Sequence, residues 1–319
     1  MYFATAGIDV SPLVPPLVAM GISFFTSMAG VSGAFLLLPF QMSFLGFTNP
    51  SVSSTNQLFN IVAIPSGVYR YLREGRMVWP LTWVVILGTL PGVFLGAWLR
   101  VAYLPDPRQF KLFAALVLGY IGLRMVRDLL RRGPAGTSKA EAEKRFQALV
   151  REYRQKDAHQ RDSGGGALPA VRVLRFDASR IAYEFYGETF DVSTPGIFAL
   201  SLVVGVVGGV YGIGGGSIVA PFFVSIYGLP VYTVAGAALM GTFVTSVAGV
   251  TFYQAIAPFY PGMSVAPDWL LGLLFGLGGM IGMYLGARCQ KFVPAKAIKW
   301  MLAVVIAYTA GSYVLAFFR

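Results

Sequence analysis

The chain has 319 residues, of which 56% are apolar and only 12% are charged. Soluble domains carry about 25% charged residues, so this composition argues against a water-exposed fold. The net charge of +11 does not indicate a nucleic-acid partner, because the excess basic residues lie at the ends of apolar runs rather than in one patch. The composition therefore predicts a protein whose main partner is the lipid bilayer.

Apolar segments long enough to span a bilayer as helices recur along the chain. No Lys or Arg occurs in residues 1–69 or 181–287, as expected where a buried charge costs several kcal/mol. Two further apolar stretches, 13–47 and 196–228, are interrupted in the middle by glycine. The expected full-length spans are 51–72, 79–100, 109–130, 231–254, 268–289 and 295–318.

The central segment, residues 131–195, differs in kind and separates a first membrane repeat (1–130) from a second (196–319). Residues 138–160 consist mostly of good helix formers and predict a polar helix. Two alternating runs follow, with a turn at Asp177–Ser179, which predicts a small β-hairpin. This α+β linker is either a solvated connector or a module that binds a regulatory partner.

An internal repeat is the strongest pattern in the sequence. Residues 30–71 align with 212–253 at a constant offset of 182, with 11 identities in 42 positions and no gap. FLGA at 94–97 also matches YLGA at 284–287. The fold class predicted is an all-α polytopic membrane protein with two homologous halves, each a glycine-broken helical hairpin followed by three spanning helices.

The basic residues favour an inverted relation between the halves. If the linker is cytoplasmic and each hairpin returns to its own side, the basic segments 70–76 and 288–299 lie inside, and the Lys/Arg-free loop 255–267 lies outside. The loop that holds Arg100, Arg108 and Lys111 does not fit this arrangement, because it would place three basic residues outside. Inverted repeats are typical of secondary transporters, whose substrate binds at the repeat interface near the midplane.

The two glycine breaks are the first candidate site. They read AGVSGAFLLLP and YGIGGGSIVAP, at equivalent places in the two halves. An unwound segment inside a membrane must line protein or water, and the free amides at the start of the next half-helix favour an anion. Close packing of small residues is the alternative explanation, and the carbonyls of the preceding half-helix leave a cation site open.

Polar residues on the helix after each break form the second candidate. They are spaced by three and four residues and so share a helix face. Neutral donors in a dry site can bind an oxyanion, although hydrogen bonds that only join helices would look the same. The residues expected to bind substrate, from breaks and faces together, are Ser32, Gly33, Ser53, Asn56, Asn60, Gly214, Gly215, Gly216, Ser217, Thr242, Thr245 and Ser246.

The sequence contains no motif that indicates an enzyme active site or a metal site. No Ser/His/Asp set, HExxH or GxxxxGK[ST] motif occurs, and Cys289 and His159 are each the sole residue of their type. We therefore expect no catalytic residues, no metal and no cofactor. The five acids of the predicted membrane part all lie at or beyond helix ends: Asp9, Glu74, Asp106, Asp128 and Asp268.

The second-half sequence GIGGGSIVAPFFVSIYGLPVYTVAGAALMGTFVTS, with its weaker copy GVSGAFLLLPFQMSFLGFTNPSVSSTNQ, resembles the TauE/SafE family of membrane permeases, the sulfite exporters. The resemblance covers roughly 13–130 and 196–318. It implies a multi-pass transporter for sulfite, sulfonates or related sulfur oxyanions. Ser32 and Ala34 depart from the glycine-rich form, where the second half has Gly214 and Gly216.

The function predicted is thus secondary transport, as an exporter, of a small sulfur-containing anion such as sulfite or an organosulfonate across the cytoplasmic membrane. An anion channel is one alternative, and a non-transporting membrane scaffold or sensor that acts through the linker is another. The sequence is also compatible with a homo-oligomer.

Overall fold

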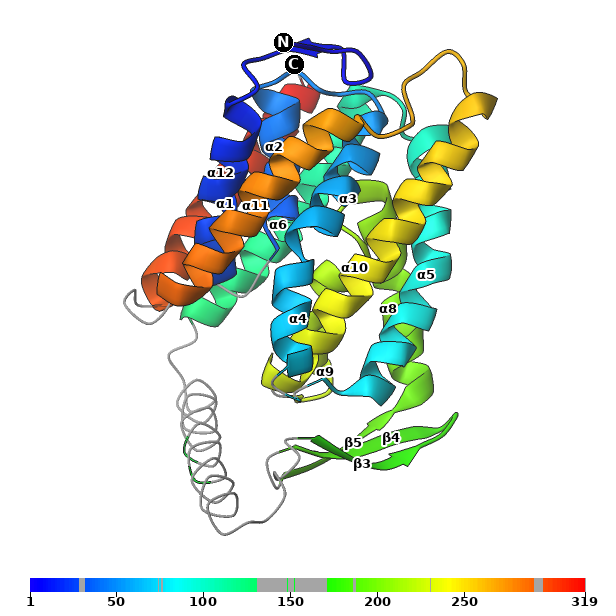
Figure 1. The fold of residues 1–319 in the computed structure, drawn as a ribbon, viewed down its shortest axis with the longest axis vertical. Helices are drawn as coiled ribbons and strands as arrows, with labels where there is room; N and C mark the ends of the chain where they lie inside the picture. The colour runs from blue at the N-terminus through cyan, green and yellow to red at the C-terminus, as the bar shows by residue number, and fades with distance from the viewer. Residues whose placement is uncertain are drawn as a thin grey trace.

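The structure is a helical bundle with a small β-sheet at one end and both chain termini at the other (Figure 1). It is a computed structural model, and it describes residues 1–28, 32–73, 75, 77–130, 148, 152, 171–185, 188–229, 231–289 and 295–318.

Among the described residues, six helices precede the linker. They are α1 (Val14–Met28), α2 (Ala34–Ser43), α3 (Ser51–Ala63), α4 (Pro65–Arg73), α5 (Trp79–Ala102) and α6 (Pro107–Leu130). A two-stranded hairpin that the sequence did not predict, β1 (Tyr2–Phe3) with β2 (Ile8–Asp9), precedes them. Strands of two residues are too short to leave a periodic pattern.

The part that follows the linker contains α8 (Thr194–Tyr211), the 3₁₀ turn η1 (Gly215–Ile218), α9 (Val219–Ile226), α10 (Val231–Ile256), the 3₁₀ turn η2 (Ala257–Phe259), α11 (Trp269–Cys289) and α12 (Ala295–Phe318). Its order of helices matches that of the first part, with α10 in the place of α3 and α4.

Five helices within the described ranges are long and apolar enough to cross a membrane: Trp79–Ala102, Thr194–Tyr211, Thr233–Phe259, Trp269–Gly286 and Trp300–Phe318. Large apolar side chains on α12, such as Val304 and Leu315, are exposed, as expected where lipid is the solvent. The chain is therefore a mostly helical, multi-pass membrane protein.

The expectation of one span over 51–72 is wrong, because the segment forms two helices. α3 ends at Ala63 and α4 begins at Pro65. Ile64 keeps helical torsion angles, but Pro65 has no amide hydrogen to donate to the carbonyl four residues before it, so the regular helix is interrupted there. The break lies one turn after Asn60.

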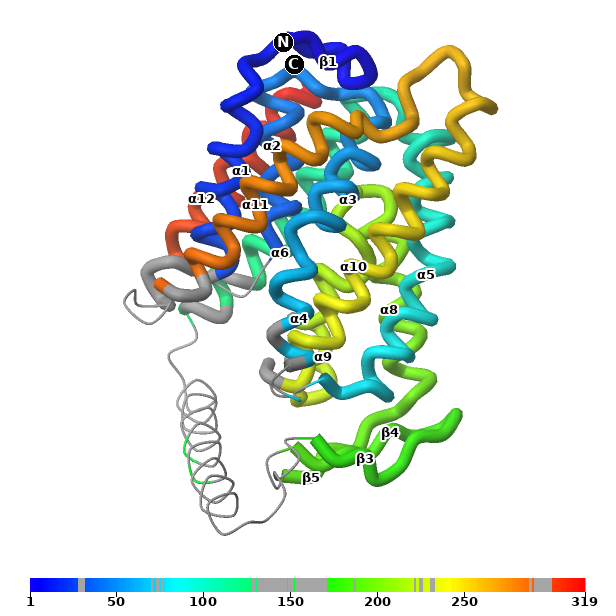
Figure 2. Tube along the Cα trace, in the orientation of Figure 1, coloured from blue at the N-terminus to red at the C-terminus, as the bar shows by residue number. Residues whose placement is uncertain are grey.

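Both glycine-interrupted stretches turn back on themselves (Figure 2). α2 returns toward the end that holds the termini, and α9 returns toward the sheet. The second turn depends on glycine, since Gly212 and Gly214 have φ of 80° and 75°. Of the first turn, residues 29–31 lie outside the described residues, and Ser32 and Gly33 lead into α2.

Glycines let two pairs of helices approach to backbone contact. α5 packs on α8, and α11 packs on α1. A Cβ atom on any of three α5 glycines would collide with a carbonyl oxygen of α8. A Cβ atom on any of three α11 glycines would likewise collide with a carbonyl oxygen of α1. The contacts are Gly88 with Phe198, Gly92 with Leu202, Gly96 with Val206, Gly278 with Pro16, Gly282 with Met20 and Gly286 with Phe24.

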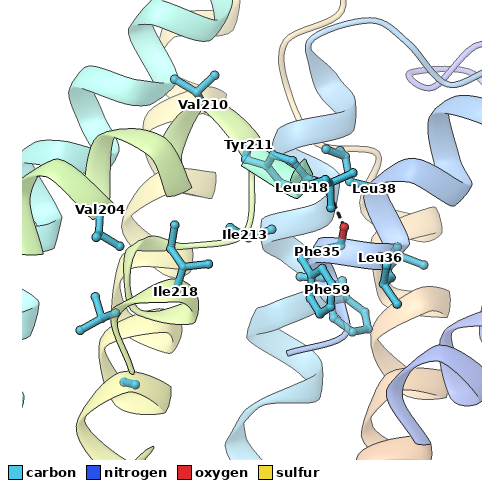
Figure 3. Close-up of a cluster of buried hydrophobic side chains, with 14 of the residues drawn as sticks. Phe35, Leu36, Leu38, Phe59, Leu118, Val204, Val210, Tyr211, Ile213 and Ile218 are labelled. Atoms are coloured by element: carbon cyan, nitrogen blue, oxygen red, sulfur yellow. Dashed lines mark hydrogen bonds between the residues drawn. The ribbon is translucent and has the colours of Figure 1, made fainter. Parts of the chain in front are cut away.

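The remaining helices complete the bundle around these pairs. α6 packs on α12, α3 on α10, α10 on α5 and α11 on α3. The apolar core reaches both breaks: Phe35, which follows the first, lies beside Tyr211, which precedes the second (Figure 3). The Tyr211 hydroxyl donates to the Phe35 carbonyl over 2.9 Å, so the two hairpins meet inside the bundle.

The linker ends in a three-stranded antiparallel sheet, β3 (Val171–Phe176), β4 (Arg180–Phe185) and β5 (Glu188–Ser193). The predicted turn at Asp177–Ser179 joins β3 to β4, but the prediction of a two-stranded hairpin is wrong because the second run forms two strands. Of the helix expected over 138–160, only residues 148 and 152 lie in the described ranges, and both are helical.

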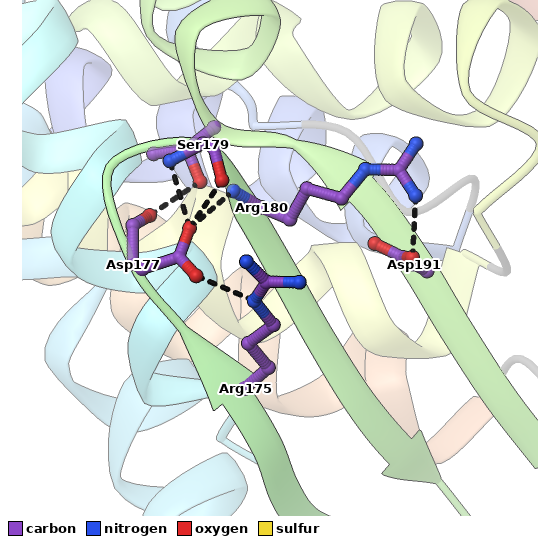
Figure 4. A network of polar contacts seen from close by, with 6 residues as sticks. Arg175, Asp177, Ser179, Arg180 and Asp191 are labelled. Atoms are coloured by element: carbon purple, nitrogen blue, oxygen red, sulfur yellow. Dashed lines mark hydrogen bonds and ion pairs between the residues drawn. The ribbon is translucent and has the colours of Figure 1, made fainter.

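The turn between β3 and β4 is built around one carboxylate (Figure 4). Asp177 accepts from the Ser179 hydroxyl over 2.6 Å, from the amides of Ser179 and Arg180 over 2.8 Å each, and from Arg175 over 2.5 Å. These bonds hold the pKa of Asp177 well below its usual range. β5 continues directly into α8, with the Ser193 side chain accepting from the Gly196 amide at the helix start.

Gly96→Ala tests the close contact of α5 with α8. The added methyl group would collide with the Val206 carbonyl and lie 2.8 Å from the Val210 amide nitrogen, so the helices must separate. We expect destabilisation by about 1–3 kcal/mol, seen as a lower thermal unfolding midpoint in detergent. Gly119→Ala on α6, where a Cβ meets nothing within 4 Å, is the matched control and should leave the midpoint unchanged or higher. Equal midpoints for the two variants would contradict the packing argument.

Candidate functional site

A buried polar centre lies where the two breaks meet the middle of α3 and α10. Ser53, Asn56 and Asn60 on α3 are fully buried, and all residues from Ser51 to Asn60 are buried. A buried amide must be hydrogen-bonded to avoid a large desolvation cost, so the partners of these side chains define the site.

Asn60 joins the two breaks. Its Oδ1 accepts from the Ser32 hydroxyl over 3.2 Å, and its Nδ2 donates to the Ile213 carbonyl over 2.9 Å. The same Nδ2 lies 3.3 Å from Ser246 Oγ on α10. One carboxamide on α3 therefore holds the first break, the second break and α10 together.

Asn56 and Ser53 also donate hydrogen bonds to backbone carbonyls at or near the breaks. Asn56 Nδ2 donates to the carbonyls of Ala34 and Gly212, over 3.0 and 3.1 Å, and its Oδ1 accepts from Gln41. Ser53 Oγ donates to the Val210 carbonyl over 3.1 Å. The carbonyls of Val210 and Gly212 lie at the C-terminal end of α8, where they have no partner within the helix, and these side chains supply one.

On α10 the threonines turn their hydroxyls toward the second break. Thr242 and Thr245 each donate to a carbonyl of their own helix, over 2.8 and 2.6 Å. Thr245 Oγ1 also accepts from the Gly215 amide over 3.0 Å, and Thr242 Oγ1 lies 3.3 Å from Ser217 Oγ. Ser217 is the most open of these residues, because it is only partly buried.

Neighbouring atoms lie so close to the glycines of the breaks that a side chain would collide with them. A Cβ on Gly214 would lie 2.7 Å from Ser246 Oγ, and one on Gly33 would lie 2.8 Å from Ser23 Oγ. A Cβ atom on Gly215 would collide with Thr89 of α5, and a Cβ atom on Gly216 would collide with Thr242 of α10. These glycines therefore allow α5 and α10 to close around the break.

Each break also presents one amide to a neutral hydroxyl oxygen. The Ala34 amide donates to Ser32 Oγ over 3.3 Å, and the Gly215 amide donates to Thr245 Oγ1 over 3.0 Å. An oxygen of a bound anion could accept the same bonds, and would do so more strongly because it carries charge.

The described residues of the polar centre include no charged side chain. Asp268 lies at the start of α11, where it accepts from the amides of Ala6 and Leu271. Arg100 lies near the end of α5, donating to the carbonyls of Leu104 and Thr48 with its guanidinium over the Phe110 ring. Across the part of the chain that the structure describes, no three His, Cys, Asp or Glu residues come together as a metal site would require.

All twelve residues expected to bind substrate come together in this centre. The structure uses their side chains chiefly to bond protein groups, whereas the sequence predicted donors that face the substrate. Sequence reasoning did not assign a role to Gln41 or Thr89. Gln41 supports Asn56, and a polar residue within the apolar run of α2 was the signal that could have identified it.

Comparison with known families now decides the class of the protein. The family model of the sulfite exporter TauE/SafE matches residues 16–313, nearly the whole chain. The chain belongs to the TauE/SafE family. The resemblance seen in the sequence is thereby confirmed, and the family is one of membrane transporters rather than enzymes. Comparisons with curated proteins and with solved structures gave no match.

Asn60→Ala tests the joint between the breaks. The change leaves the Ile213 carbonyl without its buried donor, which should cost about 1–3 kcal/mol of stability. Thermal unfolding in detergent measures the loss. Thr251→Ala is the control, because Thr251 is exposed on α10 and donates only within its own helix. A midpoint for Asn60→Ala as high as that of the control would show that Asn60 does not hold the breaks together.

Proposed function

We propose that the chain is a secondary transporter that exports a small, singly charged sulfur oxyanion, such as hydrogen sulfite or an organosulfonate, across the cytoplasmic membrane. Membership of the TauE/SafE family supports the substrate class. The observation that carries the proposal is the polar centre, buried in the middle of the bundle and built from both broken hairpins.

Neutral groups suit a small oxyanion. The amides of Ala34 and Gly215 at the two breaks donate to hydroxyl oxygens, and an anion oxygen could take the place of these acceptors. A cation site is disfavoured, because the carbonyls of Gly212 and Ile213 already accept from Asn56 and Asn60, and the acids Asp106 and Asp268 lie just before α6 and α11.

The lack of a fixed positive charge favours one negative charge over two. The cost of burying an ion rises with the square of its charge, and neutral donors offset only part of it. Arg100 is held near the end of α5 by the carbonyls of Leu104 and Thr48 and by the Phe110 ring, so it is not among the groups that form the centre. Sulfite with one bound proton, or a sulfonate, meets this condition.

The pairing of helices supports two halves related by a two-fold axis. Each hairpin packs on a helix of the other half, α1 on α11 and α8 on α5, whereas α6 packs on its own counterpart α12. The carbonyls contacted by the glycine triplets are Pro16, Met20 and Phe24 in α1, and the α8 residues 182 positions further along: Phe198, Leu202 and Val206.

The two hairpins enter from opposite ends of the bundle, as inverted halves require (Figure 2). Such halves support alternating access, because the first can adopt the conformation of the second and open the centre to the other side. We infer that the sheet end is cytoplasmic, since segments 70–76 and 288–299 then lie inside. Arg100 no longer counts against this topology, because it is buried rather than exposed to either aqueous phase.

Two other functions predict different behaviour. An anion channel would conduct without saturation or exchange. A scaffold or sensor that acts through the linker would have no need of a buried polar centre at both breaks. The polar centre therefore favours transport over a scaffold, and saturation of the flux distinguishes a transporter from a channel.

Cysteine labelling tests the topology. In a Cys289→Ser background, Arg175→Cys in the sheet should react only with reagent supplied from the cytoplasmic side, and Tyr260→Cys in the loop after α10 only from outside. The unsubstituted Cys289→Ser protein is the control for background labelling. Reaction of both cysteines from the same side would refute the inverted arrangement.

A flux experiment tests the transport mechanism. Right-side-out vesicles loaded with labelled sulfite should lose it faster when an inside-negative potential is imposed, because 100 mV contributes about 2.3 kcal/mol per negative charge that leaves. Asp106→Asn should leave the flux largely intact, since no carboxylate of the described centre can relay a proton. Flux that is indifferent to voltage, together with loss of flux in Asp106→Asn, would contradict the mechanism.

A further inference from the structure

Gln57 is a polar residue of α3 that the polar centre does not use. It is fully buried, yet neither its Oε1 nor its Nε2 has a hydrogen-bond partner. Its neighbours on the same face, Ser53 and Asn60, lie four residues before and three after it, and both are bonded. A buried carboxamide without a partner is costly, so its presence calls for an explanation.

The side chain lies against Gly249 of α10. A Cβ atom on Gly249 would lie 2.7 Å from Gln57 Cδ and 2.8 Å from Nε2, so only glycine leaves room for the carboxamide. Ser246, three residues earlier on α10, contacts Asn60, and Tyr253, four residues later, contacts Ser53. Gln57 therefore occupies the middle of a continuous polar seam between α3 and α10.

The repeat offers a direct comparison for this contact. At the offset of 182, Gln57 corresponds to Leu239 and Gly249 corresponds to Gly67. Leu239 packs against Gly67, with its Cδ1 3.4 Å from where a Cβ would lie. An apolar side chain thus makes the equivalent helix contact in the other half, and packing alone gives no reason for a carboxamide at position 57.

We propose that Gln57 is a substrate-binding residue, whose Nε2 donates a hydrogen bond to an oxygen of an oxyanion held between α3 and α10. This inference rests on the proposed function, and it adds that the site is asymmetric. The first half supplies a donor where the second half supplies Leu239. A carboxamide contributes no net charge, so it suits the same singly charged anion that the neutral centre favours.

Gln57→Leu separates binding from folding, because it reproduces the apolar contact that the second half already makes. We expect the thermal unfolding midpoint to stay the same or rise, since two unbonded polar atoms are removed. The Kd for sulfite, measured by titration calorimetry on purified protein, should rise about 10- to 100-fold through loss of a hydrogen bond to a charged ligand. Leu239→Val is the matched control, and its Kd should equal that of the wild type.

The outcomes distinguish this inference from the proposed function. An unchanged Kd in Gln57→Leu, while wild-type protein binds sulfite, would overturn the inference alone. A lower midpoint with an unchanged Kd would show instead that Gln57 holds a structural water, and would overturn it too. Wild-type protein that binds neither sulfite nor methanesulfonate would overturn the proposed function itself.

Discussion

Inside a bilayer, every backbone carbonyl that leaves a helix needs a hydrogen-bond partner within the protein, because lipid offers none. The second break exposes the carbonyls of Val210, Gly212 and Ile213, and side chains of α3 bind all three. The polar face of α3 and the unwound segment of the second half therefore depend on each other. Neither could be made apolar or regular alone without leaving buried polar groups unbonded.

The same constraint explains the use of glycine. The polar side chains reach the breaks only if α5 and α10 come close, and Gly214, Gly215 and Gly216 permit that approach. Further from the centre, glycine triplets on α5 and α11 bring the hairpins into backbone contact with their partner helices. Close packing and ligand binding are thus not competing explanations of these glycines, because packing is what encloses the polar centre.

Charge is arranged around the centre rather than in it. Arg100 bonds carbonyls and an aromatic ring near one end of α5, and Asp268 caps α11. At the opposite end of the bundle, the turn around Asp177 orders a sheet that runs through Ser193 into α8. The second hairpin is therefore attached to a three-stranded sheet, whereas the first follows the short β1–β2 hairpin.

The sequence by itself determined the membrane class, most spans, the position of the breaks and the polar face of α3. These features follow from local composition and from helical periodicity, which act over a few residues. The repeat was also visible, because a constant offset needs no structure to detect. The same local reasoning failed at Pro65, where a proline outweighed an apolar run, and in the sheet, where one alternating run became two strands.

Only the tertiary structure decided the partners of the polar residues. The sequence could place Asn56, Gln57 and Asn60 on one helix, but not show that the asparagines bond the breaks while Gln57 bonds nothing. It counted Arg100 as a surface charge, whereas the fold buries it. Each of these differences depends on residues distant in the chain, such as Gly249 opposite Gln57, and such contacts leave no trace in local periodicity.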